Sequence, residues 1–297
     1  MATDLSNWDW YRTFLAVLEE GSLSAAARAL GVTQPTAGRH IEALERHLGL
    51  PLFTRSQQGL LPTEAARRLQ PQAKLMATTA ASLMRMASGE RDGISGTVRI
   101  SASDVVGVEV LPPILAALQG EHPGLTVELS LSDKIEDLLR READIAVRMT
   151  APRQEVLLVR TVGPVALGLH ARRDYLDRHG MPETPDDLAR HRLIGFDRET
   201  AFIRAAMDAL PMLSGLSFAF RSDNNLAQLA AIRAGMGIGL CQVPLARREP
   251  DLVRLFAKEI ALPLETHVVM HEDMKSARRC RLVFDALVQG LKTFIAS

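Results

Sequence analysis

Six residues with the chemistry to contact DNA lie close together in the first two turns of one short predicted helix. They are Thr33, Gln34, Pro35, Thr36, Arg39 and His40. A glutamine amide can form two hydrogen bonds with adenine, and an arginine guanidinium can pair with guanine or contact a phosphate. We therefore interpret Gln34, Thr36 and Arg39 as candidate DNA contacts, at the helix end that meets base edges. For His40 a phosphate contact and a plain surface position are equally supported. A solvated polar face is the alternative for the whole set.

The elements that would position these residues form a helix–turn–helix. A preceding helix should begin at Ser6. The next helix is capped by Ser22 or Ser24 and ends near Gly31. Thr33 caps the helix that holds the candidate contacts, and its first turn tolerates a proline. Its buried stripe has helical spacing: Ala37, Ile41, Leu44 and Leu48.

Residues 51–61 predict a small hairpin, or wing, after this helix. The pattern is a hydrophobic start, a polar turn at residues 57–59 and an apolar return. Arg55 lies near the expected tip, where it could contact a phosphate or the minor groove. A surface arginine on a loop is the alternative.

Charge is distributed unevenly along a chain that is neutral overall. The 297 residues include 35 Lys and Arg against 35 Asp and Glu. Residues 21–92 contain nine basic against five acidic residues, an excess of four. Such a modest excess suggests that affinity for DNA comes from two or more modules acting together. Binding should still depend measurably on salt.

Other chemistries find little support. Cys241 and Cys280 have no CxxC motif, so a reduced, cytoplasmic protein with buried inert thiols is expected, with a redox pair as the alternative. His267 and His271 have metal-ligand spacing only on a helix, and their segment is typical of a strand. There is no Ser/His/Asp grouping, glycine-rich phosphate loop or metal-ligand cluster, so we predict no enzyme activity, metal or cofactor. The polar N-terminus and the lack of a long apolar run predict no signal peptide and no membrane span.

Residues 64–88 predict a long helix rich in Ala, Met and Leu. Pro71 should kink or break its first turns. An apolar stripe follows helical spacing: Leu69, Ala73, Met76, Ala80, Leu83 and Ala87. We expect this stripe to pack against a second copy of the chain, with packing on its own C-terminal domain as the alternative. The glycine-rich, charged segment 89–96 predicts a hinge.

From residue 97 onward the pattern changes to alternating strands and helices. The predicted strands are 97–103, 125–132, 144–147, 165–171, 193–196, 216–221, 237–243 and 266–270, and the predicted helices are 106–119, 135–142, 174–179, 185–189, 226–234 and 276–294. The first five elements form a βαβαβ run, which predicts a mostly parallel sheet.

The N-terminal segment resembles the DNA-binding domain of the LysR-type transcriptional regulators. The matching residues are Phe14, Ala25, Ala26, Ala27, Leu30, Gln34, Pro35, Arg39, Ile41, Leu44, Glu45, Leu48, Gly49, Leu52, Phe53, Arg55 and Thr63. Two residues depart from the family pattern: Gly38 stands where serine is common, and Ala66 where glycine is usual. Length and layout agree over essentially the whole chain. The resemblance implies a multidomain protein with an all-α winged helix-turn-helix domain (1–63), a linker helix and hinge (64–93), and an α/β effector domain (94–297).

The resemblance further implies that the effector domain has two lobes, like a periplasmic binding protein. Lobe one would comprise about 94–163 and 265–297, and lobe two about 164–264. Strand ends and helix N-termini would then face a shared cleft whose backbone N–H groups favour an anion. The candidate effector contacts are Ser101, Ala102, Ser103, Asp104, Arg148, Phe196, Asn224 and Asn225.

Each of these candidates has a structural alternative. Ser103 and Asn224 would also serve as helix caps, Arg148 could pair with Asp144, and Phe196 could belong to the core.

The resemblance implies a ligand-responsive transcriptional regulator that binds double-stranded DNA and senses a small, anionic metabolite. It would act as a homodimer or homotetramer, with RNA polymerase as a further partner. Two alternatives stay open: an architectural or repressor protein with a vestigial cleft, which no metabolite would affect, and an enzyme fused to a DNA-binding domain.

Overall fold

A computed structural model describes residues 8–56, 59–87, 94–132, 143–150, 157–198, 201–213 and 215–297. Its contacts divide the chain into an N-terminal unit that ends at Met84 and a C-terminal unit that begins beyond it. The predicted helix start at Ser6, the predicted helix at 135–142 and most of the predicted hinge lie outside the described residues. Within the described ranges, no helix is both long enough and apolar enough to cross a bilayer.

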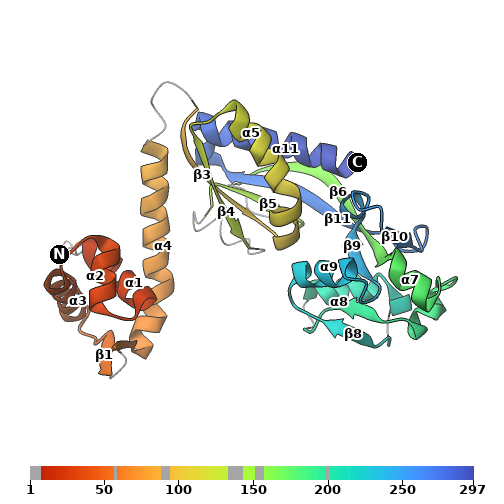
Figure 1. Ribbon diagram of the computed structural model, residues 1–297. Helices are drawn as coiled ribbons and strands as arrows, with labels where there is room; N and C mark the ends of the chain where they lie inside the picture. Colours follow the sequence, from red (N-terminus) through yellow and green to blue (C-terminus); the bar gives the residue numbers. More distant parts are fainter. Residues whose placement is uncertain are drawn as a thin grey trace. The chain divides into compact units, whose positions relative to one another are not determined.

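The N-terminal unit has the predicted order of elements: α1 (Trp8–Glu20), α2 (Leu23–Leu30), α3 (Gln34–Leu48), β1 (Phe53–Ser56), β2 (Gly59–Pro62) and α4 (Glu64–Ala87) (Figure 1). The core between these elements is apolar and includes Phe14, Leu44 and Leu52. Of the two serines predicted as caps of α2, Ser22 takes the role, because its side chain accepts from the backbone N of Ala25 at 3.2 Å. The predicted winged helix-turn-helix is confirmed.

The wing is anchored on the turn between α1 and α2. The backbone N of Leu60 donates to the carbonyl of Gly21 at 3.1 Å. Gly59 has a φ of 121°, and a Cβ at this position would lie 2.7 Å from the same carbonyl oxygen. Only glycine allows this approach of the two backbones, so the residue fixes where the hairpin lies.

Pro71 does not break α4, which continues from Glu64 to Ala87 across it. The proline has no N–H, so the helical hydrogen bond to the carbonyl of Arg67 is absent. Ala66 and Ala73, on either side of the proline, are buried in the core of the unit. This tertiary packing outweighs the local preference, as it does for most protein helices. Of the predicted kink or break, the break was wrong.

The two halves of α4 have different surroundings within the N-terminal unit. Ala66 and Ala73 pack with α1 and α3 in the core, whereas three large apolar side chains nearer the C-terminal end are exposed. Met76 is 39% exposed, Leu83 58% and Met84 73%. Part of the predicted apolar stripe therefore packs on its own DNA-binding unit, an arrangement that neither sequence interpretation included.

The C-terminal unit contains, among its described residues, a seven-stranded sheet, a two-stranded sheet and the helices that cover them. Its strands are β3 (Gly96–Ala102), β4 (Leu125–Leu131), β5 (Ile145–Arg148), β6 (Leu157–Arg172), β7 (Leu193–Gly195), β8 (Phe218–Arg221), β9 (Gly239–Gln242), β10 (Leu252–Leu255) and β11 (Leu262–His271). Its α-helices are α5 (Leu111–Glu121), α7 (Arg173–His179), α8 (Ala201–Asp208), α9 (Asn225–Arg233), α10 (Val243–Ala246) and α11 (Arg278–Ala296). A π-helical turn (Val106–Val110) precedes α5, and 3₁₀ turns span Pro185–Arg190, Pro211–Leu213 and Glu272–Ser276.

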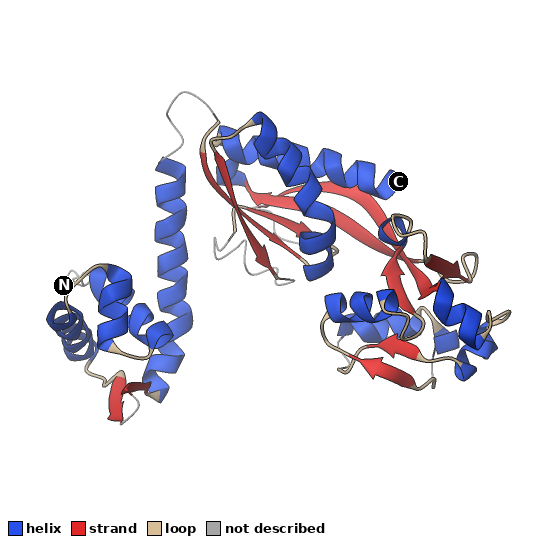
Figure 2. Cartoon of the chain, viewed as in Figure 1, coloured by secondary structure: helices blue, strands red, loops and turns tan. Residues whose placement is uncertain are grey.

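The order in the large sheet is β10-β6-β11-β5-β3-β4, with β9 also paired to β6. Strands β4, β3 and β5 are parallel, as a βαβαβ run requires, but β11, β6, β10 and β9 join in antiparallel pairs. The prediction of a mostly parallel sheet therefore holds only for these first three strands. Helices α5 and α11 lie side by side over them (Figure 2), so closely that a Cβ on Gly290 would lie 2.6 Å from the side chain of Ile114.

Strands β6 and β11 are much longer than predicted, and they connect the two halves of this unit. They pair from Leu157 opposite His271 to Leu167 opposite Leu262, with a register shift between Thr266 and His267. The half with β3, β4, β5, α5 and α11 is lobe one, and the half with β7, β8, α8 and α9 is lobe two. The lobes share these two strands, and the C-terminal segment returns to lobe one. The predicted lobe boundaries lie beside the register shift.

Candidate nucleic-acid interface and effector region

The N-terminal end of α3 presents the predicted polar residues on an exposed, internally bonded surface. Thr33 caps the helix, its Oγ1 accepting from the backbone N of Thr36 at 3.4 Å, and the two hydroxyls lie 2.9 Å apart. Arg39 Nη2 donates to Thr36 Oγ1 at 3.4 Å. Gln34, Pro35 and Arg39 are exposed and Thr36 is half-buried. Five of the predicted residues, including Thr33 itself, thus share the accessible, capped end of this helix.

Ser24 on α2 positions the amide of Gln34, a contact that sequence reasoning missed. Its hydroxyl donates to Gln34 Oε1 at 3.0 Å. A glutamine that is held before binding loses less side-chain entropy when it contacts a base. The only sequence signal was a serine near the start of α2, which is also consistent with a cap.

A hollow of about 390 Å³ opens beside this surface, lined by Leu23, Gln34, Pro35, Gly38, Arg39 and Glu42. Its lining includes Gly38, where a Cβ would lie 3.9 Å from the nearest atom, Leu23 Cδ1. A serine would fit at this position without a clash. The glycine therefore removes a side chain from the exposed face rather than meeting a packing need.

His40 contacts the interior of the N-terminal unit. Its Nδ1 lies 2.8 Å from Thr13 Oγ1, and Thr13 itself donates to the carbonyl of Asp9 at 2.7 Å. Because the single hydroxyl proton of Thr13 is used there, His40 Nδ1 must be the donor. His40 thus ties α3 to α1, and its predicted phosphate contact stays a prediction.

Glu45 connects α3 to the start of the wing, which sequence reasoning also missed. Its Oε1 accepts from the backbone N of Leu52 at 2.6 Å and from that of Phe53 at 3.1 Å. Thr63 supports the other strand by donating to the carbonyl of Pro51 at 2.9 Å. Arg55 lies on β1 opposite Leu60, but its side chain is outside what the structure describes.

In lobe one, the predicted effector residues Ser101, Ala102 and Arg148 are buried. Arg148 Nη2 donates to Ser101 Oγ at 2.8 Å, while Nη1 donates to the carbonyls of Ser101 at 3.1 Å and Val147 at 3.0 Å. The carboxylate of Asp144 accepts from the backbone N of Arg99 at 2.8 Å. The structure therefore brings Ser101 and Arg148 together and gives the arginine an internal role.

Asp104 in lobe one and Asn225 in lobe two are in direct contact. Asp104 Oδ2 accepts from the backbone N of Asn225 at 3.1 Å, and Oδ1 accepts from its side-chain Nδ2 at 3.2 Å. Asn225 is the first residue of α9, and Asn224 caps that helix by accepting from the backbone N of Ala227 at 2.9 Å. A carboxylate at a helix N-terminus is favourable because the free N–H groups and the helix dipole attract it. The capping alternative for Asn224 is the role seen here.

Ser103 and Phe196, the two other predicted effector residues, do not take part in these contacts between the lobes. The carbonyl of Ser103 accepts from the backbone N of Gly107 at 2.8 Å, which starts the turn before α5. Phe196 follows β7 and is half-buried. Neither observation tests whether these residues contact a ligand.

A second link between the lobes is an ion-pair cluster. Arg233 donates to both carboxylate oxygens of Glu109, at 2.7 and 2.8 Å, and its Nη2 and Nε donate to Glu249 Oε1 at 2.6 and 2.8 Å. The hydrogen bond from Arg233 is the main reason that the pKa of Glu109 lies below its ordinary value. The bond to Glu109 likewise raises the pKa of Arg233. This cluster was not predicted, because its members are far apart in the sequence.

Both cysteines are buried and neither forms a disulfide. Burial raises the pKa of the Cys241 thiol to about 12, so the reactive thiolate is suppressed. His267 and His271 lie on strand β11, as predicted. In the part of the chain that is described, no three His, Cys, Asp or Glu side chains converge as metal ligands would.

Comparisons with known proteins agree with this architecture. Residues 8–67 match the sequence model of the bacterial regulatory helix-turn-helix protein, lysR family, and residues 91–292 match that of the LysR substrate binding domain. A probable HTH-type transcriptional regulator, LtrA of Klebsiella pneumoniae, is 28% identical over 239 residues, which cover 79% of this chain and 76% of that protein. An uncharacterized HTH-type regulator of Escherichia coli K12, YhjC, is 26% identical, covering 95% and 97%.

Among solved structures, full-length CbnR in complex with its target DNA has the same fold. The TM-score is 0.69 at 20% identity, and the match covers 97% of this chain and 99% of CbnR.

Proposed function

This chain belongs to the LysR family of transcriptional regulators, and on that premise we propose that α3 reads operator DNA while the C-terminal domain senses a small anionic ligand. The family assignment makes the protein a regulator rather than an enzyme, with a helix-turn-helix for DNA and a substrate-binding domain. The observation that carries the residue-level proposal is the exposed N-terminal end of α3. There Thr33 caps the helix and Ser24 holds Gln34.

In this proposal, DNA is contacted by Thr33, Gln34, Pro35, Thr36, Arg39, His40 and Arg55. Gln34 reads a base edge through its amide, and Arg39 contacts guanine or phosphate. CbnR, whose fold this chain shares, has been solved with target DNA, which supports a duplex as the partner. Because the chromosome lies in the cytoplasm of a bacterium, we place the working protein there.

The ligand is proposed to be an anion because of the chemistry at α9. The backbone N–H of Asn225, at the start of this helix, already donates a hydrogen bond to the carboxylate of Asp104. A ligand carboxylate would find the same donor if it replaced Asp104. Ser103 follows directly after the end of β3, and Arg148 is the last residue of the neighbouring strand β5. Ligand binding would change regulation only if the ligand binds two arrangements of the protein with different affinity.

A second copy of the chain is the proposed partner of α4. Leu83 and Met84 are largely exposed on this helix, and apolar side chains at helical spacing favour packing against another helix. A dimer or tetramer would present several copies of α3 to related half-sites on DNA. RNA polymerase is a further partner in this scheme.

The experiment that tests the DNA-reading proposal compares the parent protein with Gln34→Ala and Arg39→Ala on a selected operator and on random duplex. Gln34→Ala should lose discrimination between the two, by about 1–3 kcal/mol, and Arg39→Ala should weaken binding to the operator by a similar amount. Fluorescence anisotropy at several salt concentrations would measure both effects. Unchanged discrimination and affinity in both variants would refute the assigned contacts.

For the ligand, thermal shifts with small organic acids would report binding, because a ligand of the folded state stabilises it by RT ln(1 + [L]/Kd). Ser103→Ala should blunt the response of DNA binding to an acid that stabilises the parent. If no acid shifts the transition and DNA binding ignores them all, the architectural alternative is favoured.

A further inference from the structure

Glu42 is an acidic side chain on the exposed face of α3, among residues proposed to contact DNA. It is seven residues after Pro35 and three after Arg39, spacings that place all three on one side of a helix. Glu42 is exposed, whereas Ile41 and Leu44 are buried on the other side. Of the residues that line the hollow beside α3, it alone is acidic.

The carboxylate of Glu42 has no structural task in the described part of the N-terminal unit. No described residue there forms a hydrogen bond or ion pair with it. Arg39, one turn away, donates to Thr36 instead. Glu45 on the same helix gives a contrast, since its carboxylate holds Leu52 and Phe53. The fold therefore explains Glu45, whereas the exposed carboxylate of Glu42 is available to a partner outside the chain.

A carboxylate on a surface that meets DNA has a defined chemical meaning. It is repelled by phosphates, so it lowers the affinity for duplex in general. It accepts hydrogen bonds but cannot donate them, and the donors in the major groove are the exocyclic amino groups, N4 of cytosine and N6 of adenine. A group that penalises all sequences except those with a suitable donor increases specificity at the expense of affinity.

We propose that Glu42 is a specificity-determining residue that accepts a hydrogen bond from the exocyclic amino group of a cytosine or an adenine in the operator. This inference rests on the proposed function of α3. Gly38 supports it, because it lies one turn before Glu42 and its missing side chain leaves the face between Gln34 and Glu42 open. Gln34 and Glu42 are eight residues apart, or about 12 Å along the helix, and base pairs stack about 3.4 Å apart, so the two residues read different base pairs.

The first experiment selects binding sites from a random duplex library with the parent, Glu42→Gln, Glu42→Ala and Gln34→Ala. The parent should select cytosine or adenine at one position where Glu42→Ala shows no preference. The positions that depend on Gln34 should be the same in the parent and in Glu42→Ala. Glu42→Gln should keep part of the preference, because its amide oxygen still accepts.

The second experiment removes only the amino group from the DNA. Duplexes would contain 2-pyrimidinone in place of the selected cytosine, or purine in place of the selected adenine. The change should weaken the parent about tenfold, as expected for one base contact, and should leave Glu42→Ala unaffected. The substitution that produces the effect identifies the base as cytosine or adenine.

The control is Glu20→Gln, which removes the same charge from an exposed residue at the end of α1 outside the hollow. It should bind all duplexes slightly more tightly and select the parental site. The fluorescence of Trp8 and Trp10, the only two tryptophans, reports whether each variant keeps the N-terminal unit folded.

Two results would overturn the inference. One is a site selected by Glu42→Ala that matches the parental site at every position. The other is an equal penalty for the amino-free base in the parent and in Glu42→Ala. If the parent selects no sequence at all, the proposed function fails together with the role of Glu42. If Gln34→Ala alters the site and Glu42→Ala does not, only Glu42 is refuted.

Discussion

Arg233 and Glu109, 124 residues apart in the sequence, meet through two parallel hydrogen bonds of 2.7 and 2.8 Å between lobe two and lobe one. This fork-to-fork geometry is the strongest arrangement of an arginine with a carboxylate. Glu249, between α10 and β10, binds the same guanidinium. Together with the contact of Asp104 and Asn225, the pair joins α9 to the segment that leads into α5.

Replacing Glu109 with glutamine should loosen α9 from lobe one. The side chains of Glu109 and Arg233 are 21% and 33% exposed, so solvent screens the pair and we expect a loss of about 1 kcal/mol. That corresponds to about fivefold faster amide hydrogen exchange in α9 if exchange proceeds through separation of the lobes. Mass spectrometry of peptides that cover α9 would measure it.

The matched control for this variant is Glu128→Gln. Glu128 pairs with Arg99 at 3.1 Å within lobe one, so its loss should leave α9 exchange unchanged. Equal rates in the parent and in Glu109→Gln would show that the pair does not hold the lobes together.

Lowering the pH should have the same effect on α9 as the Glu109→Gln substitution. The folded-state pKa of Glu109 is lowered, so its contribution exists above the unfolded value and is lost as pH falls through the folded value.

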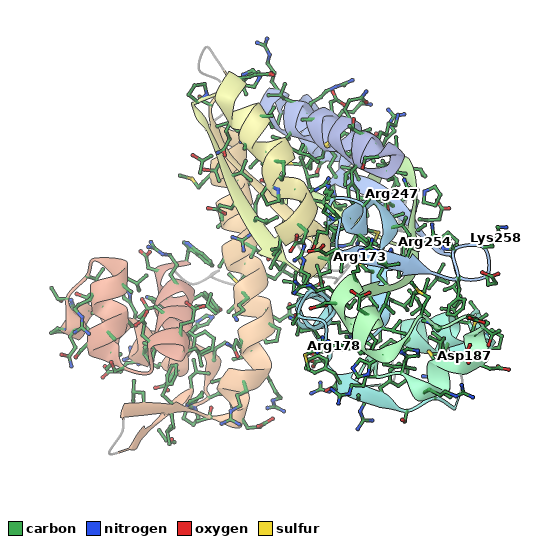
Figure 3. The ribbon with its side chains drawn as sticks, turned by 45° about the vertical axis from the view of Figure 1, so that its right-hand side comes forward. Arg173, Arg178, Asp187, Arg247, Arg254 and Lys258 are labelled. Carbon is green, nitrogen blue, oxygen red and sulfur yellow. The ribbon has the colours of Figure 1, made fainter. Side chains whose placement is uncertain are left out.

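His170 should make the C-terminal unit less stable in mild acid. It lies on β6 with 2% exposure, and its pKa falls to about 4, mainly because burial disfavours the charged ring. A hydrogen bond to the carbonyl of Gly168 opposes this shift, and the nearby Arg254 on β10 adds to it (Figure 3). Between pH 6.5 and about 4 the unfolded chain binds a proton that the folded chain does not. The free energy of unfolding should therefore decrease as the pH is lowered across this window, by up to about 3 kcal/mol.

The test is His170→Asn, which keeps a hydrogen-bond donor near Gly168 but does not titrate. Calorimetric unfolding at pH 7 and pH 4.5 should show a smaller loss of stability in this variant than in the parent. His179→Asn, at an exposed position of α7, should keep most of the parental pH dependence, because it removes only the repulsion by which His179 helps to lower the pKa of His191. If the parent and His170→Asn lose the same stability between these two pH values, His170 is not the responsible group.

What could be predicted from the sequence was largely local. Thr33 and Gly49 bound α3 through caps that depend only on neighbouring residues, and the structure has both. The exposed polar end of the helix followed from its 3.6-residue period. The contacts that hold this end in place involve more distant residues, such as Ser24 with Gln34, and no pattern in the chain specifies them.

The C-terminal unit shows where local patterns fail. The strand was predicted to start at Val165, directly after Gly163 and Pro164. Strand β6 instead continues through both, with a φ of 137° at Gly163, beside the register shift in β11. The fit between two long strands decides this, and it is a tertiary property. Arg148 illustrates the same limit, since a buried arginine bonded to Ser101 has the same sequence signal as a ligand contact.

Glu45 provides the sharpest test of how α3 is held. One carboxylate oxygen accepts from two backbone N–H groups, those of Leu52 and Phe53, at the start of the wing. Glu45→Ala leaves both donors without this acceptor, and hydrogen bonds to charged groups are worth more than neutral ones. We therefore expect the N-terminal unit to lose about 2 kcal/mol of stability. Denaturation by urea, followed by the fluorescence of Trp8 and Trp10, would measure this unit alone, because both tryptophans lie on α1.

Glu42→Ala is the control on the same helix. It removes an equal charge and a side chain of the same length, but one that is exposed, so the urea midpoint should change little. A midpoint for Glu45→Ala as high as that of Glu42→Ala would mean that the wing holds its place without Glu45. The expected difference would mean instead that two acidic residues three positions apart have separate tasks. Glu45 would bind the start of the wing to α3, and Glu42 would face the DNA.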